Sequence, residues 1–283
     1  MDSVVAIGFL LGLTAGLGIV LAVANSKLKV FEDPRIDRVQ DMLPNSNCGA
    51  CGLPGCRVSA EKVVAGAVQP SGCTVGGAET AAVVADYLGV DAGERVPTTA
   101  RLHCAGGTNV AIQMAEYRGH PTCREAAAVA GGGKGCRYGC IGYGDCEVVC
   151  TFDAIVMGPT GLPVVIVDKC TSCRDCVEIC PKDLFEILPI DQHLLVQCKS
   201  ELEGDELLEL CKVACTACER CVADAAQGLL KMSKNLPTLN PDLLHLQSPD
   251  ATRRCPTGAI TWVEGQQFQD VTEVEHAVSK TGK

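Results

Sequence analysis

The segment "CTSCRDCVEICP", residues 170–181, follows the spacing C-x2-C-x2-C-x3-C-P. Three cysteines at this spacing hold one iron–sulfur cubane on a tight loop, and the fourth, before the proline, reaches a neighbouring cluster. Upstream, "CRYGCIGYGDCEVVC" (136–150) has the looser spacing C-x3-C-x5-C-x3-C, and residues 153–168 predict two short strands joined by a Gly/Pro turn. The sequence therefore predicts a two-cluster ferredoxin-like domain over residues 136–190.

The exchange of the fourth cysteine between the two motifs predicts the ligands of both clusters. The cysteine that ends one motif joins the three that open the other. The first expected ligand set is Cys150, Cys170, Cys173 and Cys176, and the second is Cys136, Cys140, Cys146 and Cys180.

A third cysteine run, "CKVACTACERCVADAAQG" (211–228), opens in the same way but has Ala225 where its last cysteine is expected. In a two-cluster domain that last cysteine serves the neighbouring cluster, whose other ligands are also absent between residues 240 and 254. The fourth ligand of the remaining cluster is then expected to be the cysteine of a distant C-P pair, Cys255 before Pro256. Residues 198–263 are thus predicted to form a degenerate one-cluster ferredoxin-like domain, with the ligands Cys215, Cys218, Cys221 and Cys255, and with Cys211 as a candidate substitute.

The N-terminal module, residues 33–90, contains "NCGACGLPGC" (47–56), and a helix is expected over residues 78–89. The spacing C-x2-C-x4-C with a distant fourth cysteine is typical of a site for one cluster. A structural zinc ion is the alternative. The expected ligands are Cys48, Cys51, Cys56 and Cys73. The whole chain is thus expected to carry about four 4Fe-4S clusters, or about sixteen irons.

Composition favours metal ligation over disulfides. The chain has 20 cysteines in 283 residues, and they fall in tight clusters whose nearest members are poorly placed to bridge one another. With one Trp, four Tyr and five Phe, the chain lacks a large aromatic core, so we expect the cysteine-rich parts to be largely unfolded without metal. A formal net charge of −10 argues against nucleic acid as a partner.

Residues 4–24 carry no charge and would span about 31 Å as a helix, which matches the hydrocarbon layer of a membrane. We predict a transmembrane anchor over residues 1–26. A cleaved signal peptide is the alternative, because "AVA" at 22–24 resembles a cleavage site, but the segment before it has no basic residue. Basic residues follow the span, which predicts a single-pass protein of the cell inner membrane with cytoplasmic cluster domains: Lys27, Lys29, Arg35 and Arg38.

Residues 91–135 are expected to be a connecting segment with a strand and turn over 95–107, and residues 264–283 a mobile polar tail. An internal repeat is visible: "LHCAGG" before "GCRYGCIGYGDC" is echoed by "VQCKSELEG" before "CKVACTACERC". Outside the ligand sets lie Cys104, Cys123, Cys198 and Cys211. They are either buried thiols, alternative ligands, or a further metal site between the repeat halves.

Taken together, the fold class is α+β: one transmembrane helix, a small one-cluster module and two ferredoxin-like modules. The order of the membrane helix, "CGACGLPGC", "GCRYGCIGYGDC" and a two-cluster ferredoxin motif resembles the B subunit of the Rnf complex, an ion-translocating ferredoxin:NAD oxidoreductase. Long forms of that family often end in two complete ferredoxin motifs, of which one is truncated here and the other reduced to "CPTGAI". The first module alone also resembles the iron–sulfur domain of a corrinoid protein.

The resemblance implies an electron-transfer subunit that accepts electrons from soluble ferredoxin and passes them to other membrane subunits. The residues agree, because no pair of Asp, Glu or His residues is placed for substrate chemistry on this chain. Two alternatives remain open: an iron–sulfur relay subunit of another membrane redox enzyme, and a structural zinc protein.

Overall fold

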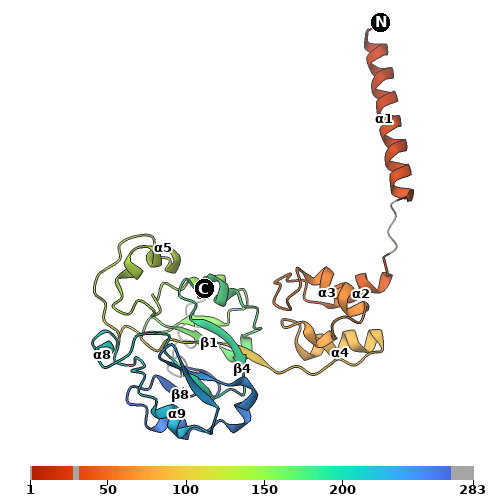
Figure 1. The fold of residues 1–283 in the computed structure, drawn as a ribbon. Helices are drawn as coiled ribbons and strands as arrows, with labels where there is room; N and C mark the ends of the chain where they lie inside the picture. Colours follow the sequence, from red (N-terminus) through yellow and green to blue (C-terminus); the bar gives the residue numbers. More distant parts are fainter. Residues whose placement is uncertain (1, 28–31, 269–283) are drawn as a thin grey trace, which may run out of the picture.

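The structure, a computed structural model, describes residues 2–27 and 32–268. The first helix, α1 (Asp2–Lys27), contains an 18-residue window, Ile7–Ala24, that is long and apolar enough to cross a membrane. The helix expected over residues 4–24 is therefore confirmed. In Figure 1 it extends from the remainder of the chain as a single straight rod.

Three helices and a short 3-10 turn form a small helical group: α2 (Pro34–Met42), α3 (Cys56–Val64), η1 (Pro70–Gly72) and α4 (Gly77–Leu88). The Asp33 side chain caps α2, and α4 ends at Gly89, which takes the left-handed conformation that glycine tolerates. Val39, Ala60 and Val84 are buried where these helices meet. The helix expected over residues 78–89 is confirmed.

The first β unit, residues 98–189, has the order strand, helix, hairpin, helix, strand. Strand β1 pairs antiparallel with β4, from Thr98 opposite Pro189 to Leu102 opposite Phe185, and β2 pairs with β3. Its core combines aliphatic side chains with cysteines, including Cys146 and Cys176. The elements are β1 (Thr98–Leu102), α5 (Cys123–Ala128), η2 (Ala130–Gly133), α6 (Asp145–Val149), β2 (Ile155–Met157), β3 (Pro163–Val165), η3 (Val167–Lys169), α7 (Asp175–Ile179) and β4 (Phe185–Pro189).

The second β unit, residues 194–262, repeats that order. Strand β5 pairs with β8 and β6 with β7, again antiparallel, over a core that includes Leu194, Leu229 and Ile260. The repeat seen in the sequence is therefore also a repeat of topology. Its elements are β5 (Leu194–Val196), α8 (Leu207–Leu210), α9 (Arg220–Asp224), β6 (Leu230–Ser233), β7 (Leu236–Leu239), η4 (Pro241–Leu246), α10 (Asp250–Arg253) and β8 (Ile260–Trp262).

Two expectations change in detail. The predicted connecting segment, 91–135, supplies β1 and thus completes the first sheet. The expected tail, 264–283, begins in packed structure, because the Gln267 side chain bonds both backbone groups of Leu102, at 2.9 and 2.7 Å. Residues 269–283 lie outside the described residues.

Candidate metal centres

Sixteen cysteines line four cavities, four in each, and every cavity encloses about 330 to 380 Å³ of space free of protein atoms. Within the described residues, no three His, Cys, Asp or Glu side chains lie close enough to hold a single metal ion. Thiolates around one zinc ion lie about 2.3 Å from it, and the sulfurs as placed here do not converge on a single point in this way. A cofactor that itself fills the space between four thiols, such as a cubane, fits this spacing better.

Site A comprises Cys150, Cys170, Cys173 and Cys176, which line one cavity together, as the sequence predicts. Ser172 and Arg174 flank Cys173 with positive φ angles of 59° and 75°, which curl the loop around the cavity. Burial raises the pKa of the Cys176 thiol to about 12. A buried thiol of this kind stays protonated at neutral pH unless a metal replaces the proton.

The buried side chain of Arg101 places a positive charge near site A, where anionic thiolates are expected. Arg101, on β1, is 1% exposed, and its Nη1 donates to the Gly265 carbonyl at 2.7 Å. Its Nε and Nη2 find no acceptor among the described residues. Burial lowers the pKa of Arg101, whereas the nearby Cys170 raises it. Because an unpaired buried charge is costly, anionic thiolates around a cluster at site A would suit this guanidinium.

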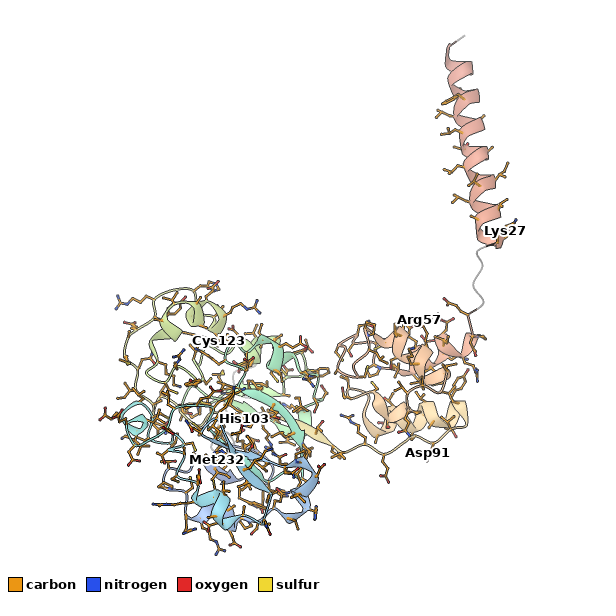
Figure 2. The ribbon with its side chains drawn as sticks, viewed as in Figure 1. Lys27, Arg57, Asp91, His103, Cys123 and Met232 are labelled. Atoms are coloured by element: carbon orange, nitrogen blue, oxygen red, sulfur yellow. The ribbon has the colours of Figure 1, made fainter. Side chains whose placement is uncertain are left out.

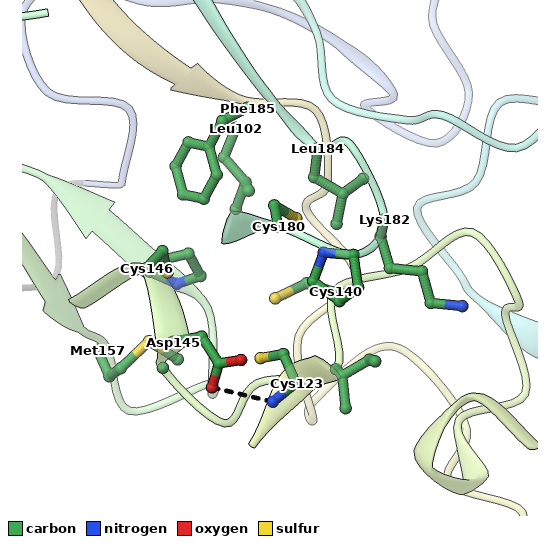
Figure 3. Close-up of a pocket in the computed structure, with 14 residues that line it drawn as sticks. Leu102, Cys123, Cys140, Asp145, Cys146, Met157, Cys180, Lys182, Leu184 and Phe185 are labelled. Carbon is green, nitrogen blue, oxygen red and sulfur yellow. Dashed lines mark hydrogen bonds between the residues drawn. The ribbon is translucent and has the colours of Figure 1, made fainter. Parts of the chain in front are cut away.

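Site B comprises Cys123, Cys140, Cys146 and Cys180, which line a second cavity (Figure 3). Spacing alone predicts Cys136 in this set, but the structure brings Cys123 there instead. Both Cys123 and Arg124 donate their backbone N–H groups to the carboxylate of Asp145, at 3.0 and 3.2 Å. Since Asp145 begins α6, these bonds tie the start of α5 to the cluster-binding loop.

The backbone explains why site B takes a distant cysteine. In the loops of all three cysteine runs, a central residue lies between two residues of positive φ. Cys173 and Cys218 hold this central position in two of them, and Tyr143 holds it in the third, between Gly142 and Gly144. The loop around Tyr143 therefore has the conformation for a ligand but has no thiol at that position. Cys123, at the start of α5, supplies the fourth thiol of site B instead. The matching flanking pairs are Ser172 with Arg174 and Ala217 with Glu219.

Site C comprises Cys215, Cys218, Cys221 and Cys255, which line a third cavity in the second β unit. These are the four cysteines expected from the truncated motif. Cys211, the candidate substitute, lies in a different cavity. Burial raises the pKa of Cys221 to about 11. Burial also acts to raise the pKa of Cys255, but hydrogen bonds from the backbone of Ile260 and Thr257 outweigh it, so the pKa of Cys255 is lowered. Cys218 is exposed, so site C reaches the surface.

Site N, in the helical group, comprises Cys48, Cys51, Cys56 and Cys73. Burial raises the pKa of Cys73, and the other three thiols act on it in the same direction, so the four lie together. Asn47 accepts the backbone N–H of Cys56 at 2.8 Å, while Gly76 donates to the Cys73 sulfur at 3.4 Å. Gly55 (φ 146°) allows the Asn47 contact, because a Cβ there would lie 3.0 Å from the amide oxygen.

Known proteins with similar sequences indicate which protein family carries these cysteine sites. Residues 43–75, which contain site N, match a family model described as "Putative Fe-S cluster". The B subunit of the Na(+)-translocating ferredoxin:NAD(+) oxidoreductase complex of Acetobacterium woodii is 42% identical over 250 residues, which are 88% of this chain and 74% of that protein. The chain belongs to the B-subunit family of ion-translocating oxidoreductase complexes.

Two further members of the B-subunit family match over nearly their whole length. The one from the proton-translocating ferredoxin:NAD(+) oxidoreductase complex of Clostridium ljungdahlii is 35% identical, over 93% of either chain. The one from an ion-translocating oxidoreductase complex of Methanosarcina acetivorans is 32% identical, over 86% of this chain and 92% of its own length. Family membership thus concerns both β units as well as the matched N-terminal segment.

Proposed function

We infer that this chain is the iron–sulfur electron-transfer subunit of a membrane-bound ferredoxin:NAD oxidoreductase that translocates ions. The observation that carries the inference is the gathering of cysteines, four at a time, at sites N, A, B and C in a member of the B-subunit family. Bound 4Fe-4S clusters would supply one-electron steps. The thiols would hold the clusters, and the short strands position the loops that carry the thiols.

The two β units support the ferredoxin-like part of the proposal. The order strand, helix, hairpin, helix, strand is that of a ferredoxin-like unit, and both units have it. Sites A and B share one core, in which Cys176 lies near enough to Cys146 to raise the pKa of that thiol further after burial has raised it. The second unit keeps the topology but has one site of this kind, because Ala225 stands at the position of Cys150 and residues 240–254 supply no equivalents of Cys170, Cys173 and Cys176.

The apolar helix α1 would attach the protein to the membrane, with soluble ferredoxin as electron donor and other membrane subunits as acceptors. Basic residues just after the helix favour a cytoplasmic location for the cluster sites. In Figure 2 the last of the helix residues, Lys27, lies at the end of α1 that faces the helical group.

Reduced ferredoxin is expected to bleach the visible absorbance of both the full-length protein and a variant lacking residues 1–27. Only the full-length protein should sediment with membranes, because the deletion removes α1 and leaves the cysteine sites intact. Anaerobic absorbance spectra and membrane fractionation measure the two effects. A colourless, zinc-containing protein would refute the electron-transfer role, whereas a brown protein that ferredoxin does not reduce would indicate another donor.

Replacing Cys255 with Ser is expected to remove about four irons, whereas replacing Ala225 with Cys adds none. Cys255 lines the site C cavity, whereas Ala225 caps the end of α9 and packs against the core of the second β unit. Residues 240–254 supply no cysteines to complete a second cluster there. Iron and acid-labile sulfide are counted per chain, with Thr257→Ala, beside Cys255, as the matched control. Unchanged iron in the Cys255 variant would contradict the assignment of site C.

A further inference from the structure

Four cysteines remain once sites N, A, B and C are filled, and they line one further cavity. It encloses about 340 Å³, within the range of the cavities at sites A, B and C. Its members come from three stretches of chain that the sequence motifs divide among separate modules. We name this group site D: Cys104, Cys136, Cys198 and Cys211. With it, all 20 cysteines fall into five sets of four.

Site D is built twice from the same repeat element. Cys104 follows strand β1 by two residues, and Cys198 follows strand β5 by two residues. Cys136 and Cys211 each open a C-x3-C pair whose second cysteine belongs to site B or site C. The two halves of the repeat therefore contribute equivalent pairs to one cavity, which explains why these cysteines recur outside the motifs.

Two equivalent hydrogen bonds join site D to its neighbours. The backbone N–H of Cys140, a site B residue, donates to the Cys104 sulfur at 3.4 Å. The backbone N–H of Cys215, a site C residue, donates to the Cys198 sulfur, also at 3.4 Å. Sulfurs that accept N–H bonds in this way are suited to the thiolate form that ligates a cluster. Site D thus lies between sites B and C.

The lining of site D favours an anionic occupant. Lys134 and Lys199 line the cavity, and its lining contains no Asp or Glu. The Lys134 ammonium donates to the carbonyls of Gly106 and Cys140, which holds it at the cavity wall. A side chain at Gly106 would crowd the site, because a Cβ there would lie 3.0 Å from the Cys211 sulfur and 3.7 Å from that of Cys104.

We propose that site D holds a fifth 4Fe-4S cluster, which joins the two β units into one continuous series of sites. Four thiolates around an oxidised cubane core carry a net charge of about −2, which the cationic lining offsets. The inference rests on the iron–sulfur loading of the other sites. It raises the expected content from about sixteen irons to about twenty per chain.

Iron and zinc counts on the full-length holoprotein, purified without oxygen, test the proposal. Wild type should contain about twenty irons and no stoichiometric zinc, and Cys136→Ser and Cys211→Ser should each lack about four irons. The double variant should lack the same four, because both residues hold one cluster. Combining Cys211→Ser with Cys255→Ser should remove about eight, which separates site D from site C. Ser233→Ala on β6, a residue outside the linings of sites A, B, C and D, is the control.

A wild type with about sixteen irons would overturn the proposal and leave the proposed function standing. One zinc per chain that disappears in the Cys211 variant would also overturn it, by identifying site D as a zinc site. A protein without iron would overturn both the proposal and the proposed function. Electron paramagnetic resonance of the dithionite-reduced Cys211 variant guards against misfolding, because the signals of sites A and C should persist in it.

Discussion

Cys123→Ser is expected to remove about four irons from the chain, and adding Tyr143→Cys to that variant is expected to restore them. The reason is the shared loop conformation: Tyr143 stands where Cys218 stands in site C, between two residues of positive φ. A thiol at position 143 would replace the one that α5 supplies. Iron and sulfide counts on the three proteins, each purified without oxygen, measure the loss and the recovery.

The Tyr143→Cys variant alone is the first control, and it should keep the iron content of wild type because site B already has four thiols. It loses the edge-on contact of Tyr143 with Tyr117, whose ring centroids are 5.8 Å apart, at a cost of about 1 kcal/mol. The second control is Cys136→Ser with Tyr143→Cys. If this protein regains the iron and the Cys123→Ser, Tyr143→Cys protein does not, the fourth ligand of site B is Cys136 and not Cys123.

Local spacing was enough to predict which cysteines gather at sites A and C. Each is built from a C-x2-C-x2-C loop plus one cysteine that a general rule for two-cluster domains identifies. The hairpin β2–β3 was likewise predictable, since residues 153–168 contain two short apolar runs separated by Gly and Pro. For these sites and strands, neighbouring residues in the sequence are enough for the prediction, and the tertiary structure adds little.

Site B could not be fully predicted, because its fourth thiol comes from outside the motif. Cys123 precedes Cys140 by 17 positions in the sequence. The fold brings Cys123 to the loop, where its backbone N–H donates to the Asp145 carboxylate. One signal was present in the sequence: Gly142 and Gly144 flank a position three residues after Cys140, as Ala217 and Glu219 flank Cys218. For site D, the repeat raised the alternative of a further metal site between its halves, but only the packing of those halves brings Cys136 to that cavity in place of Cys123.

Removing the iron is expected to unfold both β units. Their strands are three to five residues long and form two-stranded sheets, which have little stability of their own in water. Their cores also depend on the ligands, since Cys146, Cys176 and Cys221 are buried among the aliphatic side chains. A structural metal contributes about 10 kcal/mol in small zinc domains, which is comparable to the whole stability of a typical domain. Losing several such sites at once should therefore exceed what packing alone provides.

Chelation of iron under reducing conditions tests this expectation on the full-length protein in detergent. Trp262, the only tryptophan of the chain, lies on β8 and its fluorescence should shift to that of a solvated indole. Far-ultraviolet circular dichroism should retain the helical signal of α1, which needs no metal. Reconstitution with iron and sulfide is the control and should reverse both changes. A chelated protein with less than about one iron per chain and an unshifted Trp262 emission would contradict the argument, because the aliphatic core would then hold the second β unit without its clusters.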